Sequence, residues 1–111
     1  MPQADLMYSA DLDLDAAAIL ARVEQVIADH DAGAGACKGR AYPAAVTHHS
    51  HVTLRVAMLD KPHRDAAFMS ALLADVERAV KALIAQPCAV AVELSFSSPY
   101  YATTMHDGAT S

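Results

Sequence analysis

The chain has 111 residues, a length typical of one compact domain with its own hydrophobic core. Hydrophobic residues make up 54% of the chain, but alanine inflates this fraction and aromatic residues make up only 5%. The formal net charge of −5 argues against nucleic acid and anionic membranes as partners. A small domain with few large side chains often completes its core by self-association, which we expect here.

Acidic residues interrupt the opening stretch at Asp5 and from Asp11 to Asp15, so no apolar signal-peptide core is present there. No apolar run approaches the length of a membrane span. The two cysteines, Cys37 and Cys88, match no zinc or redox spacing. We therefore expect a cytoplasmic protein with two buried thiols and no metal site.

The first part of the chain predicts a strand and then a helix. A short strand fits residues 2–9, and residues 10–31 follow with helical spacing and with Asp13 and Asp15 placed as capping residues. The apolar residues with this spacing are Ile19, Leu20, Val23, Val26 and Ile27. A loop over 32–36, rich in glycine and alanine, ends the helix.

Two strands follow this loop. The stretch 37–46 predicts a strand, and Gly39 and Pro43 within it indicate a bulge or an edge position. The stretch 47–59 predicts another strand, because apolar residues alternate with polar ones. The apolar set that shares one face is Val52, Leu54, Val56 and Met58.

A second helix and a last strand complete the pattern. The turn "LDKPHRD" at 59–65 places Pro62 where a first helical residue would suit it. Apolar spacing then predicts a helix that extends to Gln86, because Pro87 ends it. The stretch 88–97 alternates cleanly and predicts the last strand, with a small, polar tail over 99–111.

Strand–helix–strand therefore occurs twice, in pseudo-repeats at about 1–47 and 48–98 of a single domain spanning 1–111. Right-handed crossovers place both helices on one face of a four-stranded mixed sheet, an α+β fold. The other sheet face needs a cover, which again favours an oligomer.

Four stretches together resemble the tautomerase superfamily, most closely its 5-carboxymethyl-2-hydroxymuconate isomerases. They are "MP…YSADL" at 1–12, "CKGRAYPA" at 37–44, "HVTLRVAMLDKPHRD" at 51–65 and "AVAVELSF" at 89–96. The resemblance implies a homotrimer with active sites near the subunit interfaces and no metal or organic cofactor. It also implies an isomerase of aromatic compound catabolism that acts on a small carboxylate of the 2-hydroxymuconate type.

The resemblance assigns catalysis to Pro2, whose nitrogen becomes a secondary amine once Met1 is removed. A proton shuttle works best with a pKa near the working pH, and an ordinary α-amine has a pKa of about 7.7–8.0. Burial and nearby cations both disfavour the protonated amine and lower its pKa. The same cations would hold substrate carboxylates and stabilise the dienolate that forms on proton removal.

Four cations are candidates for these roles by the same resemblance. At "CKGR" we assign Arg40 a catalytic role beside Pro2, and Lys38 a role in substrate binding. At "DKPHRD" either Lys61 or Arg64 takes the place of a family arginine. A lysine there would give a point charge in place of a bidentate fork. For each of the four, a solvated surface cation is the simpler alternative.

Two further features bear on the site. Gln3 stands where close family members often carry a histidine, and glutamine cannot titrate. His49 and His51 would share a strand face, with His48 beside them, yet no third ligand at a useful spacing follows. We expect this cluster to face solvent or an interface, or to line a pocket.

Two rival functions keep the same fold. One is another reaction at Pro2: a phenylpyruvate-type tautomerase, a hydratase, a dehalogenase or a decarboxylase. The other is a non-catalytic trimeric binding protein, whose N-terminus would stay blocked by Met1. A substrate panel separates the first from the favoured isomerase, and the mass of the native protein tests the second.

Overall fold

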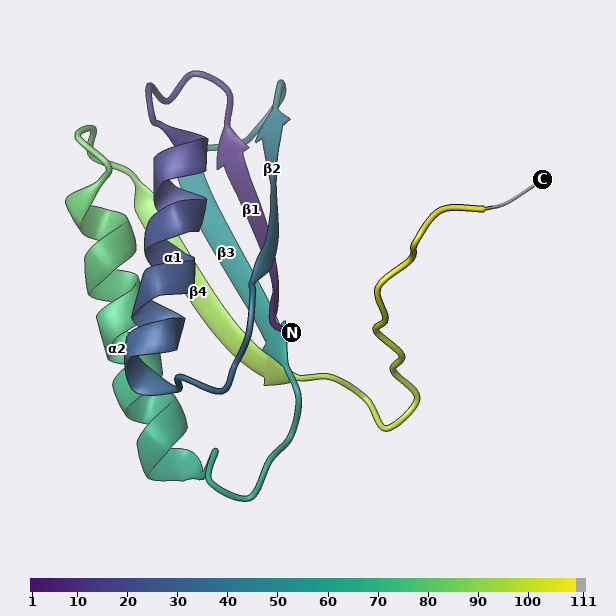
Figure 1. Cartoon of the computed structure of the whole chain (residues 1–111). Helices are drawn as coiled ribbons and strands as arrows, with labels where there is room; N and C mark the ends of the chain where they lie inside the picture. The colour runs from purple at the N-terminus through teal and green to yellow at the C-terminus, as the bar shows by residue number, and fades with distance from the viewer. Residues whose placement is uncertain (110–111) are drawn as a thin grey trace.

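The computed structural model describes residues 1–109, in which two helices cover one face of a four-stranded sheet (Figure 1). The elements in chain order are β1 (Gln3–Ser9), α1 (Ala16–His30), β2 (Lys38–Ala44), β3 (His51–Met58), α2 (Ala66–Ala82) and β4 (Ala89–Phe96). The strand order across the sheet is β2-β1-β3-β4. β1 pairs with β2 and β3 pairs with β4 in parallel, whereas β1 and β3 are antiparallel. This arrangement confirms the predicted α+β class and mixed sheet.

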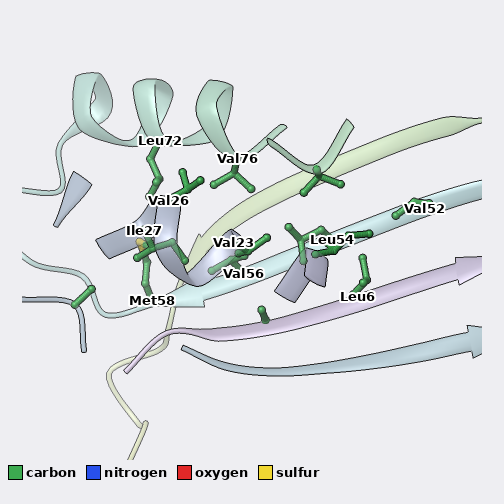
Figure 2. Packing of buried hydrophobic residues seen from close by; sticks show 14 of the residues in the cluster. Leu6, Val23, Val26, Ile27, Val52, Leu54, Val56, Met58, Leu72 and Val76 are labelled. Carbon is green, nitrogen blue, oxygen red and sulfur yellow. The ribbon is translucent and has the colours of Figure 1, made fainter. Parts of the chain in front are cut away.

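The covered face of the sheet forms the hydrophobic core (Figure 2). The alternation predicted in β3 is confirmed, because Val52, Leu54 and Val56 are fully buried and Met58 is 1% exposed. Helix residues pack onto these side chains, and the fully buried ones among them are Ile19, Val23, Leu72 and Val76. Burial of an aliphatic side chain contributes about 1.5–3 kcal/mol. The two apolar helix faces therefore hold the fold together.

The structure corrects the predicted start and end of the second helix. Asp65 is the N-cap of α2, and its side chain accepts a hydrogen bond from the backbone nitrogen of Phe68 at 2.9 Å. Pro62 lies in the turn before this cap, so the prediction that it opens the helix was wrong. The helix also ends at Ala82, before Gln86, and the backbone nitrogen of Leu83 bonds back to Val80.

No helix among the described residues covers the other face of the sheet, which carries a row of alternating charges (Figure 1). Arg40, Asp5, Arg55 and Glu93 are neighbours across the four strands in the pairing register. Beyond β4 the chain leaves the sheet as an extended segment (Figure 1), in which the side chain of Tyr100 is 97% exposed. The radius of gyration is 15.1 Å, against roughly 13 Å for a compact domain of this length. The last two residues of the predicted tail, 110–111, lie outside the described part of the chain.

Candidate active site

Pro2 lies at the start of β1, and its neighbours follow from the sheet topology. Because β1 is the second strand of the sheet, Gln3 is paired with Lys38 at the start of β2 on one side. On the other side Gln3 is paired with Ala57, near the end of β3. The α1–β2 loop and the β3–α2 turn therefore meet at this end of the sheet, where the N-terminus lies (Figure 1).

The Pro2 side chain is fully buried at this end of the sheet. Its carbonyl oxygen accepts a hydrogen bond from the backbone nitrogen of Lys38 at 2.8 Å. Met1 is half-buried, and its Cγ lies 3.7 Å from the position that a Cβ on Gly35 would occupy. While Met1 is attached, the Pro2 nitrogen is an amide. Removal of Met1 would leave a secondary amine at this buried position.

Arg40 lies two residues along β2 from Lys38 and is held by a carboxylate. Its Nε and Nη2 donate to the two oxygens of Asp5 at 2.7 and 3.2 Å, a bidentate pair. Its Nη1 donates to Oε1 of Gln3 at 3.0 Å. The hydrogen bonds to Asp5 and the charge of its carboxylate raise the pKa of Arg40 above its ordinary value. Gln3 also approaches the tail, because its Nε2 donates to the hydroxyl of Tyr101 at 3.4 Å.

Arg64 is buried in the β3–α2 turn, with its side chain 2% exposed. Its Nε and Nη2 donate to Oδ2 of Asp31 at 3.1 and 2.9 Å, and its Nη1 donates to the carbonyl of Leu59 at 2.7 Å. His63 donates from Nε2 to the same Asp31 oxygen at 2.8 Å. These contacts lower the pKa of Asp31 to about 2, His63 having the largest effect. Every nitrogen of the Arg64 guanidinium is therefore already engaged.

Lys38 and Lys61 are the two predicted cations that remain available. Within residues 1–109 neither ammonium group has a hydrogen-bond or ion-pair partner within 4 Å; Lys38 is exposed and Lys61 half-exposed. One begins β2 and the other lies in the turn after β3, so they lie on opposite sides of the β1 start. The structure thus brings all four predicted cations to one end of the sheet but leaves two lysines free.

The partners of the two arginines were not predicted from the sequence. Asp5 could have been found, because it occupies the strand face that alternation leaves open and β2 is expected beside it. Asp31 gives no such signal, since it follows the end of α1 and meets Arg64 only through tertiary packing. Buried charges need partners of opposite sign, and Asp31 is that partner for the buried Arg64.

The histidine cluster lies at the other end of the sheet. His49 precedes β3 and has a φ of 64°, so the prediction that it shares a strand face with His51 was wrong. The rings of His48 and His49 are 4.2 Å apart, and Nδ1 of His51 donates to the carbonyl of His49 at 2.9 Å. Within residues 1–109 no group of three or more His, Cys, Asp or Glu side chains could hold a metal ion. Likewise no helix among these residues could span a membrane.

Neither cysteine takes part in a disulfide, and both are half-buried, less than predicted. Cys37 directly precedes β2, and burial raises the pKa of its thiol, with a further contribution from the Glu24 carboxylate. A raised pKa lowers the thiolate fraction, which is the reactive form. Cys37 is therefore a poor nucleophile, although it lies close to Pro2 in the fold.

A groove of about 410 Å³ lies between α1 and α2, away from Pro2. Its lining includes Arg22, His30, Asp75 and Arg78. His30 donates from Nε2 to Asp75 at 2.6 Å, and Arg78 donates to the same carboxylate at 2.6 Å. These bonds lower the pKa of Asp75, His30 contributing most. The His30–Asp75 bond links the two helices to each other, whereas the Arg78–Asp75 pair lies within α2.

Two parallel β-α-β units joined through an antiparallel pair, with a proline directly before β1, define the class of fold. No protein-family model matches the chain, and no curated protein matches it by sequence. Among solved structures, it is similar to a 5-carboxymethyl-2-hydroxymuconate delta-isomerase, with a TM-score of 0.79 and 19% identity over 96% of this chain and 89% of that chain.

Two other solved structures share the fold. A malonate semialdehyde decarboxylase inhibited by 3-bromopropiolate has a TM-score of 0.72 and 11% identity over 96% of this chain and 91% of that one. A fused 4-OT described as a symmetric trimer has a TM-score of 0.69 and 11% identity over 92% of this chain and 93% of that one. The chain therefore has the fold of the tautomerase superfamily, as the sequence resemblance predicted.

Proposed function

We propose that this protein is a cofactor-independent tautomerase that interconverts the enol and keto forms of a 2-hydroxymuconate-type carboxylate. The observation that carries the proposal is the position of Pro2, buried directly before β1, with Lys38 at the start of β2 on one side and Lys61 in the turn after β3 on the other. After removal of Met1, the Pro2 amine takes a proton from the enol and returns it to carbon. The similarity to a 5-carboxymethyl-2-hydroxymuconate delta-isomerase supports this choice of substrate and a role in cytoplasmic aromatic-acid catabolism.

The cations of the site have two roles in this mechanism. Lys38 and Lys61 hold carboxylates of the substrate and stabilise the dienolate, for which each donor typically contributes about 3–4 kcal/mol. Arg40 is held against Asp5 and Gln3 at the same end of the sheet, beside Lys38. Its fixed guanidinium adds positive potential that lowers the pKa of the Pro2 amine. Arg64 adds positive charge at this end of the sheet from its buried position in the turn.

We propose further that three copies assemble. Within residues 1–109 no helix covers the sheet face that carries Asp5 and Arg55, and Tyr100, in the segment after β4, is 97% exposed. A solved neighbour of this fold is described as a symmetric trimer. In such an assembly the open faces and the extended segments after β4 meet neighbouring copies, and each Pro2 lies near an interface.

The test compares the mature protein with Pro2→Ala in an assay of 2-hydroxymuconate ketonisation. We expect Pro2→Ala to lower kcat by about 10²–10⁴-fold, the usual contribution of a general acid–base group, and to keep the native fold. Pro43→Ala, at the sheet edge, is the matched control and should keep its activity. Retained activity in Pro2→Ala, or native protein whose intact mass still includes Met1, would refute the role of Pro2.

A panel of substrates tests the rival reactions at the same site. Phenylenolpyruvate, a haloacrylate and malonate semialdehyde represent the tautomerase, dehalogenase and decarboxylase alternatives. A rate on one of these that exceeds the 2-hydroxymuconate rate reassigns the reaction but keeps Pro2. The non-catalytic alternative predicts a trimer that turns over none of these substrates but binds carboxylates without converting them.

A further inference from the structure

Three side chains join the two loops that flank Pro2. Asp31, at the end of α1, accepts hydrogen bonds from His63 and Arg64 of the β3–α2 turn. We call these three residues the loop latch. The side chains of Asp31 and Arg64 are 11% and 2% exposed, so this pair is largely shielded from solvent. Shielded, charge-assisted pairs fix geometry far better than exposed pairs do.

Both sides of the loop latch continue into backbone hydrogen bonds. Asp31 accepts from the backbone nitrogen of Gly33 at 3.2 Å, and its carbonyl accepts from Ala34 at 3.0 Å. In the turn, the backbone nitrogen of Arg64 donates to the carbonyl of Lys61 at 2.9 Å, while its Nη1 donates to that of Leu59. The loop latch therefore fixes the backbone that leads into β2 and the backbone that carries Lys61.

These fixed segments end at the two available cations. The α1–β2 loop leads to Lys38, whose backbone nitrogen is bonded to the carbonyl of Pro2. The turn carries Lys61 on the other side of β1. We expect cross-links between the loops to influence how far apart the two ammonium groups lie around Pro2. A pair of cations at a fixed separation recognises a substrate with two carboxylates better than a substrate with one.

We propose that Asp31, His63 and Arg64 are positioning residues that set the spacing of Lys38 and Lys61 around Pro2 and so select dicarboxylate substrates over monocarboxylates. This inference rests on the proposed tautomerase function. It assigns Arg64 no contact with the substrate, because each nitrogen of its guanidinium is bonded within the turn or to Asp31. Of the two cations in the turn, the proposal assigns substrate binding to Lys61.

The first test measures substrate preference with 2-hydroxymuconate as dicarboxylate and phenylenolpyruvate as monocarboxylate. Arg64→Met should lower kcat/KM for the dicarboxylate about tenfold, mainly through KM, and change the monocarboxylate value far less, since small misplacements of binding groups are costly. Arg64→Lys should recover part of the loss. The matched control is Arg78→Met, which removes an arginine–aspartate pair from the exposed surface of α2 and should change neither value.

A loss that is equal for both substrates, or no loss, would overturn the proposal. If Arg64→Met does not fold, Asp31→Asn retains the side-chain volume and is expected to show the same preference change. A purely structural role would lower the thermal midpoint without changing the ratio of the two kcat/KM values.

The second test does not depend on activity. Hydrogen exchange of the mature protein, well below its unfolding temperature, should be faster in Arg64→Met at residues 33–38 and 61–64, but not in Arg78→Met. Unchanged exchange in these segments would overturn the loop latch. Wild-type protein that turns over neither probe would refute the proposed function instead, and the exchange result would then decide on the loop latch alone.

Discussion

The two faces of the sheet use the same strands for different purposes. On the helix-covered face, Leu54 and Val56 are fully buried among other aliphatic side chains. On the open face of the same strand, the side chain of Arg55 is 64% exposed, and its Nε lies 3.7 Å from Oε1 of Glu93. Apolar burial stabilises a fold strongly, whereas exposed ion pairs contribute little. The covered face therefore maintains the fold, and the open face and its N-terminal end are free to serve assembly and chemistry.

The largest difference between the faces should appear in a pair of substitutions at adjacent residues of β3. Leu54→Ala removes a fully buried side chain and should lower the free energy of unfolding by about 2–5 kcal/mol. Thr53→Ala, on the open face, should change it by about 0.5 kcal/mol or less. Denaturant unfolding of both variants measures the contrast. Similar losses in the two variants would show that the open face is also packed.

The next effect concerns the buried charge pair at the edge of the covered face. The pKa of Asp31 is about 2 in the folded chain, against an ordinary value of 3.8. At pH values above the unfolded-state pKa of 3.8, this depressed pKa stabilises the fold by about 2 kcal/mol. The stabilisation is lost as the pH falls through the folded-state pKa of about 2. Asp31→Asn should therefore be less stable than wild type at pH 7, and the difference should shrink between pH 4 and pH 2.

Denaturant midpoints over this pH range measure the effect. The control is Asp60→Asn, in the same turn as His63 but exposed, which should keep the wild-type pH dependence. A difference between Asp31→Asn and wild type that stays constant down to pH 2 would mean that Asp31 is not the group whose protonation weakens the fold there.

The smallest effect belongs to the open face. Glu93→Gln removes an ion pair between side chains that are 64% and 68% exposed, so it should change the free energy of unfolding by no more than about 0.5 kcal/mol. The measurement is best made at two protein concentrations. A larger loss that grows with concentration would place Glu93 inside an assembly, where the pair is shielded from solvent.

The fold could be predicted from the sequence because its signals are local. The alternation in β3 and the helical spacing in α1 each report one buried face, and both are confirmed. The predicted ends of the second helix are less accurate. Pro62 suits a first helical residue, but the capping hydrogen bond of Asp65 starts α2 four residues later. The position of His49 depended on a left-handed backbone that its neighbours in the sequence do not indicate.

The site was only partly predictable, because the sequence shows which cations are present but not how they are paired. The sequence favours Arg40 over Lys38 as the catalytic cation and leaves open whether Lys61 or Arg64 faces the site. The structure places both arginines against carboxylates, from Asp5 and Asp31, that lie more than thirty residues away in sequence. Such pairs depend on register and tertiary packing. The roles of all four cations toward a substrate stay predictions.

The central claim is that Pro2 supplies a basic amine poised near neutral pH. The most direct measurement is the rate at which an amine-specific acylating reagent modifies Pro2 of the mature protein as a function of pH, followed by mass spectrometry of the N-terminal peptide. Apolar burial and the nearby lysines should bring the midpoint to or below about 8, the ordinary value of an α-amine. Lys38→Ala or Lys61→Ala should raise that midpoint. A wild-type midpoint above about 9, or native protein in which Met1 still blocks Pro2, would contradict the account.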